Sequence, residues 1–243
     1  MLEKFNDFVE NYDLEDPNIN RKVIHSKNVR KLMLEFAKKL NWNEEEQLIA
    51  EQIGLLHDIG RFQEWKEQKS YVGLNFDHGE YGVKLLQENQ FYLDFNISEE
   101  NKKIIFNSIF FHNKFNVPEA NNDKFIKLIR DVDKIDNLMK LSANQTFYDY
   151  ISKIFQGNHV SPKIKEDFNN EKSINTKDVN SLTDYYLMIL AFIFDINYDI
   201  SIHYIKENGA IQNFAILLKE KDIYYKYLEL VNNYIERRLE NVR

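Results

Sequence analysis

The helical spacing of apolar residues along most of the chain is the feature that most constrains its fold. Between residues 20 and 40, Val29, Leu32 and Phe36 follow one another at spacings of three and four, which places them on one face of a helix. The chain has only 3 prolines and 7 glycines, so little in it interrupts long helices. No alternation typical of a strand persists beyond a few residues. The sequence therefore predicts an all-α fold.

The same spacing predicts a succession of helices with two longer connections. We expect helices over Leu2–Asn11, Asn20–Leu40, Glu44–His57, His78–Asn89, Glu99–His112, Asn122–Leu141, Asn144–Phe155, Ser181–Asn208, Ala210–Leu218 and Asp222–Leu239. A polar connection containing Pro17 precedes the second of these helices. The segment Arg61–Phe76 is predicted to be a loop with one helical turn, and Gly157–Thr176 a polar loop. The first loop is expected to influence substrate choice.

Several helix ends carry recognisable signals. Asn43 is followed three residues later by Glu46, which is the spacing of a capping box. Asp77 and Ser98 stand where N-caps are expected. Gly60 fits the glycine that commonly lies just past the end of a helix. These signals predict that one helix ends immediately around the pair His57-Asp58.

Size and composition limit the classes of function. A chain of 243 residues suits one domain, with a core over about residues 20–140 and a helical extension over about 141–243. The net charge of −7 argues against binding long nucleic acid, and the absence of cysteine excludes thiolate chemistry. The apolar stretches fall short of the roughly 20 residues that span a bilayer. We expect a cytoplasmic protein that does not bind membranes; its oligomeric state stays open.

Polar residues with metal-binding side chains occur on the apolar faces of the predicted helices. His25, His57, His112 and Asp133 each share a face with apolar residues. Asp58 follows one of these histidines directly, and a further histidine, His78, lies in the first turn of another helix. Burying such groups without partners costs several kcal/mol, so they must be paired or must ligate something. Taken together, they indicate a metal site.

The types of side chain narrow the choice of metal. Imidazole and carboxylate ligands without thiolates suit Mn, Fe, Co, Ni or Zn. A carboxylate can bridge two ions, and Asp58 is the acid that adjoins a histidine ligand, so we expect it to be the bridge. Two ions about 3.5–4 Å apart can activate a water molecule and stabilise both oxygens of a phosphoryl displacement.

The order and spacing of these residues resemble a known family. His25, the pair His57-Asp58, and Asp133 resemble the H…HD…D signature of the HD-domain superfamily of metal-dependent phosphohydrolases. The strings Leu55–Arg61 and Arg130–Asp136 are also similar to that family. His78 and His112 match the two extra histidines of its binuclear branch. The resemblance covers about residues 20–140, and the remaining hundred residues resemble nothing that we can assign.

The resemblance implies an all-α hydrolase that holds one or two divalent ions. It assigns one ion to His25, His57, Asp58 and Asp133, and a second ion to Asp58, His78 and His112. It further implies that a metal-activated water attacks phosphorus in a phosphomonoester or phosphodiester. The partner would be a small phosphorylated substrate, such as a nucleotide.

Two cationic residues are candidates for contacts with phosphate. Arg61 follows Asp58 by three residues and is either a catalytic phosphate clamp or a solvated surface arginine. Lys134 either neutralises a phosphate oxygen or pairs with Asp131 or Glu119.

The remaining polar residues of interest have simpler interpretations. Asp136 is an alternative to Asp133 as a ligand, and Asp131 points about 200° away from Asp133 on a helix, so it is expected to be exposed. His159 lies in a polar loop and is expected to be solvated. His203 lies in a helix rich in aromatic residues and is expected to be packed or hydrogen-bonded.

Two other functions use the same ligands. Some enzymes with this fold are di-iron oxygenases, and the metal ligands alone do not distinguish them from hydrolases. A non-catalytic regulatory module could also keep its metal for structure. The complete set of candidate ligands argues against this last reading, because a degenerate copy is expected to lose at least one of them.

Overall fold

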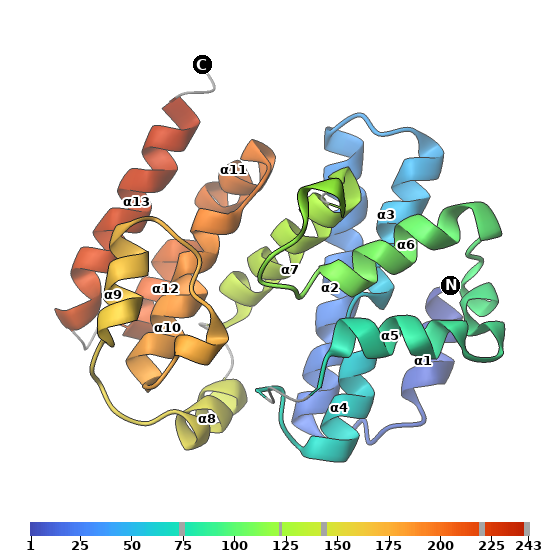
Figure 1. The fold of residues 1–243 in the computed structure, drawn as a ribbon, viewed down its shortest axis with the longest axis horizontal. Helices are drawn as coiled ribbons and strands as arrows, with labels where there is room; N and C mark the ends of the chain where they lie inside the picture. Colours follow the sequence, from blue (N-terminus) through green and yellow to red (C-terminus); the bar gives the residue numbers. More distant parts are fainter. Residues whose placement is uncertain (73–75, 122, 142–144, 219–221, 241–243) are drawn as a thin grey trace. The chain divides into compact units, whose positions relative to one another are not determined.

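The structure is a computed structural model that describes residues 1–72, 76–121, 123–141, 145–218 and 222–240 (Figure 1). Every regular element in these ranges is a helix, which confirms the predicted all-α fold. The chain divides into two compact units, Met1–Val132 and Asp133–Arg243, each with its own internal packing. The prediction of a single domain with an extension after about residue 140 stays a prediction.

The first unit contains six complete α-helices and part of a seventh among its described residues. The α-helices are α1 (Leu2–Val9), α2 (Pro17–Lys39), α3 (Glu44–Leu56), α4 (Gly60–Gln68), α5 (His78–Gln87), α6 (Glu99–Phe111) and α7 (Lys124–Leu141), with 3₁₀ helices η1 (Glu88–Phe95) and η2 (Glu119–Asn121). Helix α7 continues into the second unit. Helices α2 and α3 pack along each other, α6 packs on α3, and α5 contacts both α4 and α6.

The central pair of helices follows from the sequence pattern. Met33 and Phe36 of α2 and Ile53 of α3 are fully buried, as the apolar spacing requires. The capping box is confirmed: the Asn43 side chain accepts from the Glu46 amide at 3.0 Å, and the Glu46 carboxylate accepts from the Asn43 amide at 3.0 Å. The start of α3 is therefore fixed by its own residues.

Helix α4 differs from the predicted loop. Gly60 does not end a helix but begins α4, so its predicted role as a C-terminal glycine is wrong. A Cβ atom at Gly60 would lie 2.2 Å from the carbonyl oxygen of His78. Glycine is required here because the backbones of α4 and α5 approach each other closely. The helix ends at Gln68, and its C-cap, Lys69, has the left-handed conformation.

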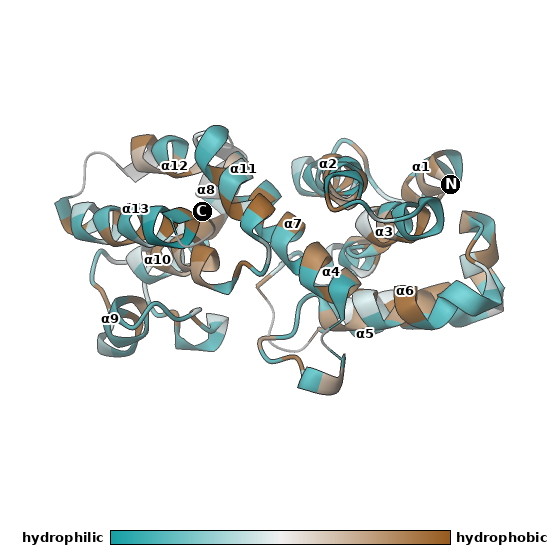
Figure 2. Cartoon of the chain, turned by 90° about the horizontal axis from the view of Figure 1, so that it is seen from above, coloured by the Kyte–Doolittle hydropathy of each residue, from teal (hydrophilic) through white to brown (hydrophobic). Residues whose placement is uncertain are grey.

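The second unit contains the remainder of α7 and six further α-helices among its described residues. These are α8 (Gln145–Ile154), α9 (Pro162–Asn169), α10 (Leu182–Leu190), α11 (Asp199–Glu207), α12 (Ala210–Leu218) and α13 (Tyr225–Glu240), with 3₁₀ helices η3 (Thr176–Asp178), η4 (Ala191–Asp195) and η5 (Asp222–Tyr224). Teal and brown residues alternate along α13 in Figure 2, as expected of a helix with one buried face.

The structure corrects the predicted helices at Pro17, at Pro162 and within Ser181–Asn208. Pro17 and Pro162, which the sequence places in connections, are the first residues of α2 and α9, a position that proline favours. The prediction of a loop over Gly157–Thr176 is therefore wrong for the residues of α9. The predicted helix Ser181–Asn208 is interrupted between α10 and α11, where Ile196 is extended. Arg238 of α13 donates to the carbonyl oxygens at this break, so a tertiary contact stabilises the interruption.

A buried carboxylate organises the start of α10. Asp184 is fully buried and accepts from the Ser161 amide at 2.8 Å, from the Ser161 hydroxyl at 2.5 Å and from the Asn180 amide at 3.1 Å. Its own amide donates to the hydroxyl of Ser181, the N-cap of α10, at 2.9 Å. The carboxylate therefore ties the residue before α9 to the start of α10.

Within the described ranges, we find no helix with both the length and the apolar character that crossing a membrane requires.

We expect Gly60→Ala to destabilise the first unit by about 3 kcal/mol, because the new methyl group meets a backbone carbonyl that cannot rotate away. Urea unfolding followed by tryptophan emission measures this loss, since both tryptophans, Trp42 and Trp65, lie in the first unit. Gly82→Ala is the matched control, since its methyl would meet a side-chain methyl of Ile59 at 3.2 Å. Equal losses for both variants would contradict the proposed close approach.

We expect Asp184→Ala to lower the free energy of unfolding of the second unit by several kcal/mol, because it leaves buried donors without acceptors. Asp184→Asn retains one acceptor oxygen and should lose less. Far-UV circular dichroism during thermal unfolding reports the change. An unchanged melting curve for the alanine variant would show that the buried network contributes nothing.

Candidate metal centre

Five of the predicted ligands come together in the first unit. His25 lies on α2, His57 and Asp58 directly follow α3, His78 is the first residue of α5, and His112 directly follows α6. All five are buried, with at most 6% of any one exposed. Residues far apart in the sequence therefore meet at one buried point because four helices direct them there.

The Asp58 carboxylate divides this cluster into two halves. Its Oδ2 atom lies 3.4 Å from Nε2 of His25 and 3.7 Å from Nε2 of His57. Its Oδ1 atom lies 3.4 Å from Nε2 of His78 and 3.5 Å from Nε2 of His112. In each half, the three candidate ligand atoms lie within 4.8 Å of one another. Each half can therefore hold one ion, with Asp58 common to both.

The hydrogen bonds of two histidines orient them as ligands. Nδ1 of His57 lies 3.0 Å from the Gly54 carbonyl oxygen, and Nδ1 of His112 lies 2.6 Å from that of Ile109. A carbonyl oxygen only accepts, so Nδ1 carries a proton, and in the neutral ring Nε2 then presents its lone pair to the centre. Burial also lowers the pKa of His78 well below its ordinary value, which keeps that imidazole neutral.

The separations between the nitrogens suit a metal ion. Nε2 of His25 and Nε2 of His57 lie 3.2 Å apart, and those of His78 and His112 lie 3.1 Å apart. Two imidazole nitrogens that bind one zinc ion at about 2.0–2.1 Å are separated by about 3.3 Å when the angle between them is near tetrahedral. The donor set of neutral imidazoles and one carboxylate fits a divalent ion in each half.

The ends of two helices add to this preference for cations. His57 is the C-cap of α3 and His112 is the C-cap of α6, and both donate their backbone amides into the last turn. The C-terminal end of a helix carries a partial negative charge. Two such ends at one buried point favour positive charge there.

A lysine that the sequence pattern did not suggest also lies at this centre. Nζ of Lys22 lies 2.6 Å from Oδ2 of Asp58, and both side chains are buried. Burial alone would raise the pKa of Asp58, but the charge of Lys22 holds that pKa well below its ordinary value. Lys22 stands one helical turn before His25, on the same face, and this spacing was the available signal.

Arg61 lies near the other carboxylate oxygen of Asp58. Its Nε atom lies 3.7 Å from Oδ1 of Asp58, and its Nη1 atom donates to Glu64 at 2.5 Å and to the Tyr71 carbonyl oxygen at 3.2 Å. The side chain is only 18% exposed, so its interpretation as a solvated surface arginine is wrong. Its role as a phosphate clamp stays a prediction. Glu64 is fully buried, and burial raises its pKa although Arg61 opposes this.

Three further candidates lie on α7, in the second unit. Asp133 is the first residue of that unit, and its carboxylate accepts from Nδ2 of Asn137 at 2.9 Å. Lys134 pairs with Asp195 at 2.7 Å, a partner that the sequence did not suggest. Asp136 is buried and pairs with Lys140 at 3.1 Å. The assignment of Asp133 as a ligand and of Lys134 as a catalytic residue stays a prediction.

Three other expectations concern exposure. Asp131 is fully buried, so the prediction that it is exposed is wrong. The reason is that the five consecutive residues 128–132 are all buried, so α7 has no exposed face there. His159 is exposed, as predicted. His203 is also exposed on α11, and its predicted packing is wrong because it lies on the outer face of that helix.

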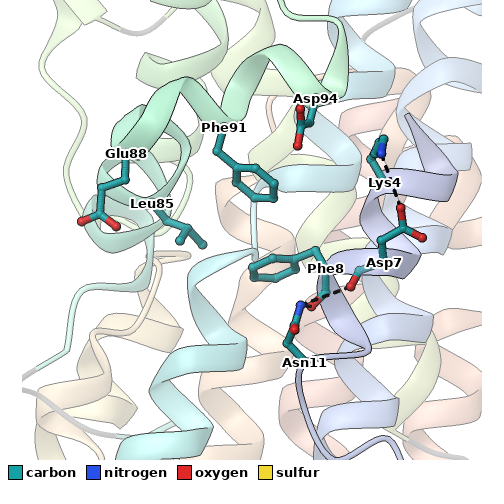
Figure 3. A pocket seen from close by; sticks show the side chains of 8 residues that line it. All are labelled: Lys4, Asp7, Phe8, Asn11, Leu85, Glu88, Phe91 and Asp94. Carbon is teal, nitrogen blue, oxygen red and sulfur yellow. Dashed lines mark hydrogen bonds and ion pairs between the residues drawn. The ribbon is translucent and has the colours of Figure 1, made fainter.

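A separate pocket of about 520 Å³ lies between α1 and the segment around η1 (Figure 3). Phe8, Leu85 and Phe91 supply its apolar lining, whereas Asp7, Glu88 and Asp94 supply carboxylates. Lys4 pairs with Asp7 at 3.6 Å. The acidic lining disfavours a phosphate, and none of the candidate metal ligands lines this pocket.

Comparison with known proteins agrees with this geometry. Residues 23–138 match the family model of the HD domain. No curated protein and no solved structure matches the chain. The matched range contains His25, the pair His57-Asp58 and the other histidines of the cluster. Residues 23–138, slightly less than half of the chain, therefore match an HD domain, and the buried cluster of histidines with Asp58 is consistent with the metal site of that family.

Proposed function

We propose that the chain is a metal-dependent phosphohydrolase that cleaves a phosphomonoester or phosphodiester of a small metabolite, such as a nucleotide. The observation that carries this proposal is the Asp58 carboxylate, whose two oxygens each face a separate pair of histidine nitrogens. A carboxylate in this position suits two ions held side by side. The match of residues 23–138 to the HD domain supports hydrolysis as the type of reaction.

In the proposed centre, His25, His57 and Asp58 would hold one ion, and Asp58, His78 and His112 would hold a second. We retain Asp133 as a fourth ligand of the first ion. When bound, a pair of divalent ions lowers the pKa of a water molecule and stabilises the attacking and leaving oxygens of a phosphoryl displacement.

The residues of the chain supply the rest of the environment. Lys22 and Arg61 place positive charge on opposite oxygens of Asp58, which favours the approach of an anionic phosphate. Burial of the four histidines and of Asp58 limits the access of bulk water. Low local polarity strengthens each of these electrostatic contacts.

We expect phosphatase activity in a screen of nucleotides and sugar phosphates with Mn, Fe, Co, Ni and Zn added in turn. Asp58→Asn conserves shape but removes the charge of the bridge, so activity should fall on the order of a thousandfold. His203→Ala, on the exposed face of α11, is the matched control and should retain activity. Full activity of the Asp58→Asn protein would rule out the proposed centre.

Metal content provides a test that does not depend on the substrate. Because each histidine pair belongs to one half, His25→Ala and His112→Ala should each remove one of two ions, whereas Asp58→Asn should remove both. Inductively coupled plasma mass spectrometry on the purified proteins measures the stoichiometry. A single ion that both histidine variants remove would contradict the binuclear arrangement.

The same preparations distinguish the oxygenase alternative. An iron-loaded protein that gives a mixed-valent di-iron signal on partial reduction and consumes oxygen, without releasing phosphate from any tested substrate, would replace hydrolysis as the proposed reaction.

A further inference from the structure

Three cationic side chains surround one aromatic ring beside the metal centre. Cζ of Arg21 lies 5.3 Å from the centroid of the Tyr71 ring, Nζ of Lys22 lies 5.5 Å from it, and Cζ of Arg61 lies 5.6 Å from it. All three distances are within the range of cation–π attraction, which is about 6 Å. We call these four residues the Tyr71 cluster. It lies in the first unit, on α2, α4 and the segment after α4.

The ring at the centre of this cluster is held in place. The Tyr71 hydroxyl donates to the Asn18 carbonyl oxygen at 3.1 Å, and the Tyr71 carbonyl oxygen accepts from Arg61. The ring lies 4.8 Å from that of Trp65, whose Nε1 donates to Asp16 at 2.6 Å. Burial raises the pKa of Tyr71 well above its ordinary value, so the phenol stays neutral. The cluster is therefore preorganised around a neutral aromatic ring.

The Tyr71 cluster is continuous with the metal centre. Lys22 and Arg61 contact Asp58 as well as Tyr71, so one side of the cluster faces the bridge. Arg21 stands next to Lys22 in α2, and adjacent helical side chains point about 100° apart. Arg21 therefore extends the positive charge beyond the two side chains that reach Asp58.

The charge balance of this region favours an anion. The cluster brings three cations together in a chain whose net charge is −7. One nearby carboxylate, Asp58, is the proposed bridge and would share its charge with the metal ions. A second carboxylate, Glu64, is fully buried and contacts Arg61, and a third, Asp16, accepts from Trp65 beside the Tyr71 ring. With ions bound, Asp58 contributes less to balancing the cluster, so an anionic group on the ligand would be stabilised there.

We propose that the Tyr71 cluster is the subsite for a second phosphate group, and that the substrate therefore carries two phosphates, as a diphosphate or a bisphosphate does. This inference rests on the proposed function, in which the first phosphate binds at the metal ions. Arg21 is the specificity-determining residue, because its guanidinium can form paired hydrogen bonds with phosphate oxygens. A substrate with one phosphate would reach the metal ions without using Arg21.

The test compares two non-hydrolysable probes that differ by one anionic group, methylenediphosphonate and methylphosphonate. Isothermal titration of the manganese-loaded full chain gives the affinity for each. The wild-type protein should bind the diphosphonate more tightly. Because charged hydrogen bonds are lost, Arg21→Ala should reduce the ratio of the two affinities by roughly 10- to 100-fold. Arg21→Lys, which retains charge without the planar fork, should show an intermediate ratio.

The same titrations supply a control and define the results that would overturn the proposal. Arg30→Ala removes another arginine of α2, one that pairs with Glu51 at 2.5 Å, and should keep the wild-type ratio. Metal content and circular dichroism confirm that each variant is loaded and folded. An unchanged ratio in both Arg21 variants, or an equal loss of affinity for both probes, would overturn the subsite. Failure of the proposed function appears separately, as a normal ratio without hydrolysis of any phosphate ester.

Discussion

The burial of the Asp58 carboxylate is the constraint on which the rest of the first unit depends. A buried ionised carboxylate is costly unless charges and hydrogen-bond donors surround it. Lys22 meets this requirement on one oxygen, and the four histidines approach both oxygens from four directions. Helix α3 must end at Leu56 to place Asp58 there, and α2, α5 and α6 must converge on it. Any ion that binds here links these helices, so metal affinity and folding stability are coupled.

Much of this arrangement could be predicted because side chains that can bind a metal recur on the apolar faces of several predicted helices. A single polar residue on an apolar face says little, as the exposed His203 shows. Three histidines on the apolar faces of successive helices, with Asp58 beside one of them and His78 in the first turn of another helix, indicate one shared site, and these five residues do meet. The start of α3 was predictable for a local reason, since Asn43 and Glu46 cap it with their own side chains. The position of Asp133 relative to these residues stays a prediction.

The features that sequence analysis missed depend on contacts between distant residues. Gly60 has the spacing of a helix terminator, but the carbonyl of His78 determines its role. The interruption between α10 and α11 is stabilised by Arg238, some forty residues later in the chain. Lys22 was overlooked because a lysine at the edge of an apolar face normally extends its charge into water. Here the ammonium group of Lys22 is buried, because it pairs with the carboxylate of Asp58, which follows α3.

Helix α7 has a consequence for anyone who shortens this protein. It runs without a break from Lys124 to Leu141, although the chain divides between Val132 and Asp133. Truncation at that division would cut the helix at mid-length, remove about 13 Å of it and leave its last four carbonyl oxygens without partners. The apparent boundary between units is therefore a poor place to end a recombinant fragment. A fragment meant to retain the whole HD domain should extend at least to the end of α7.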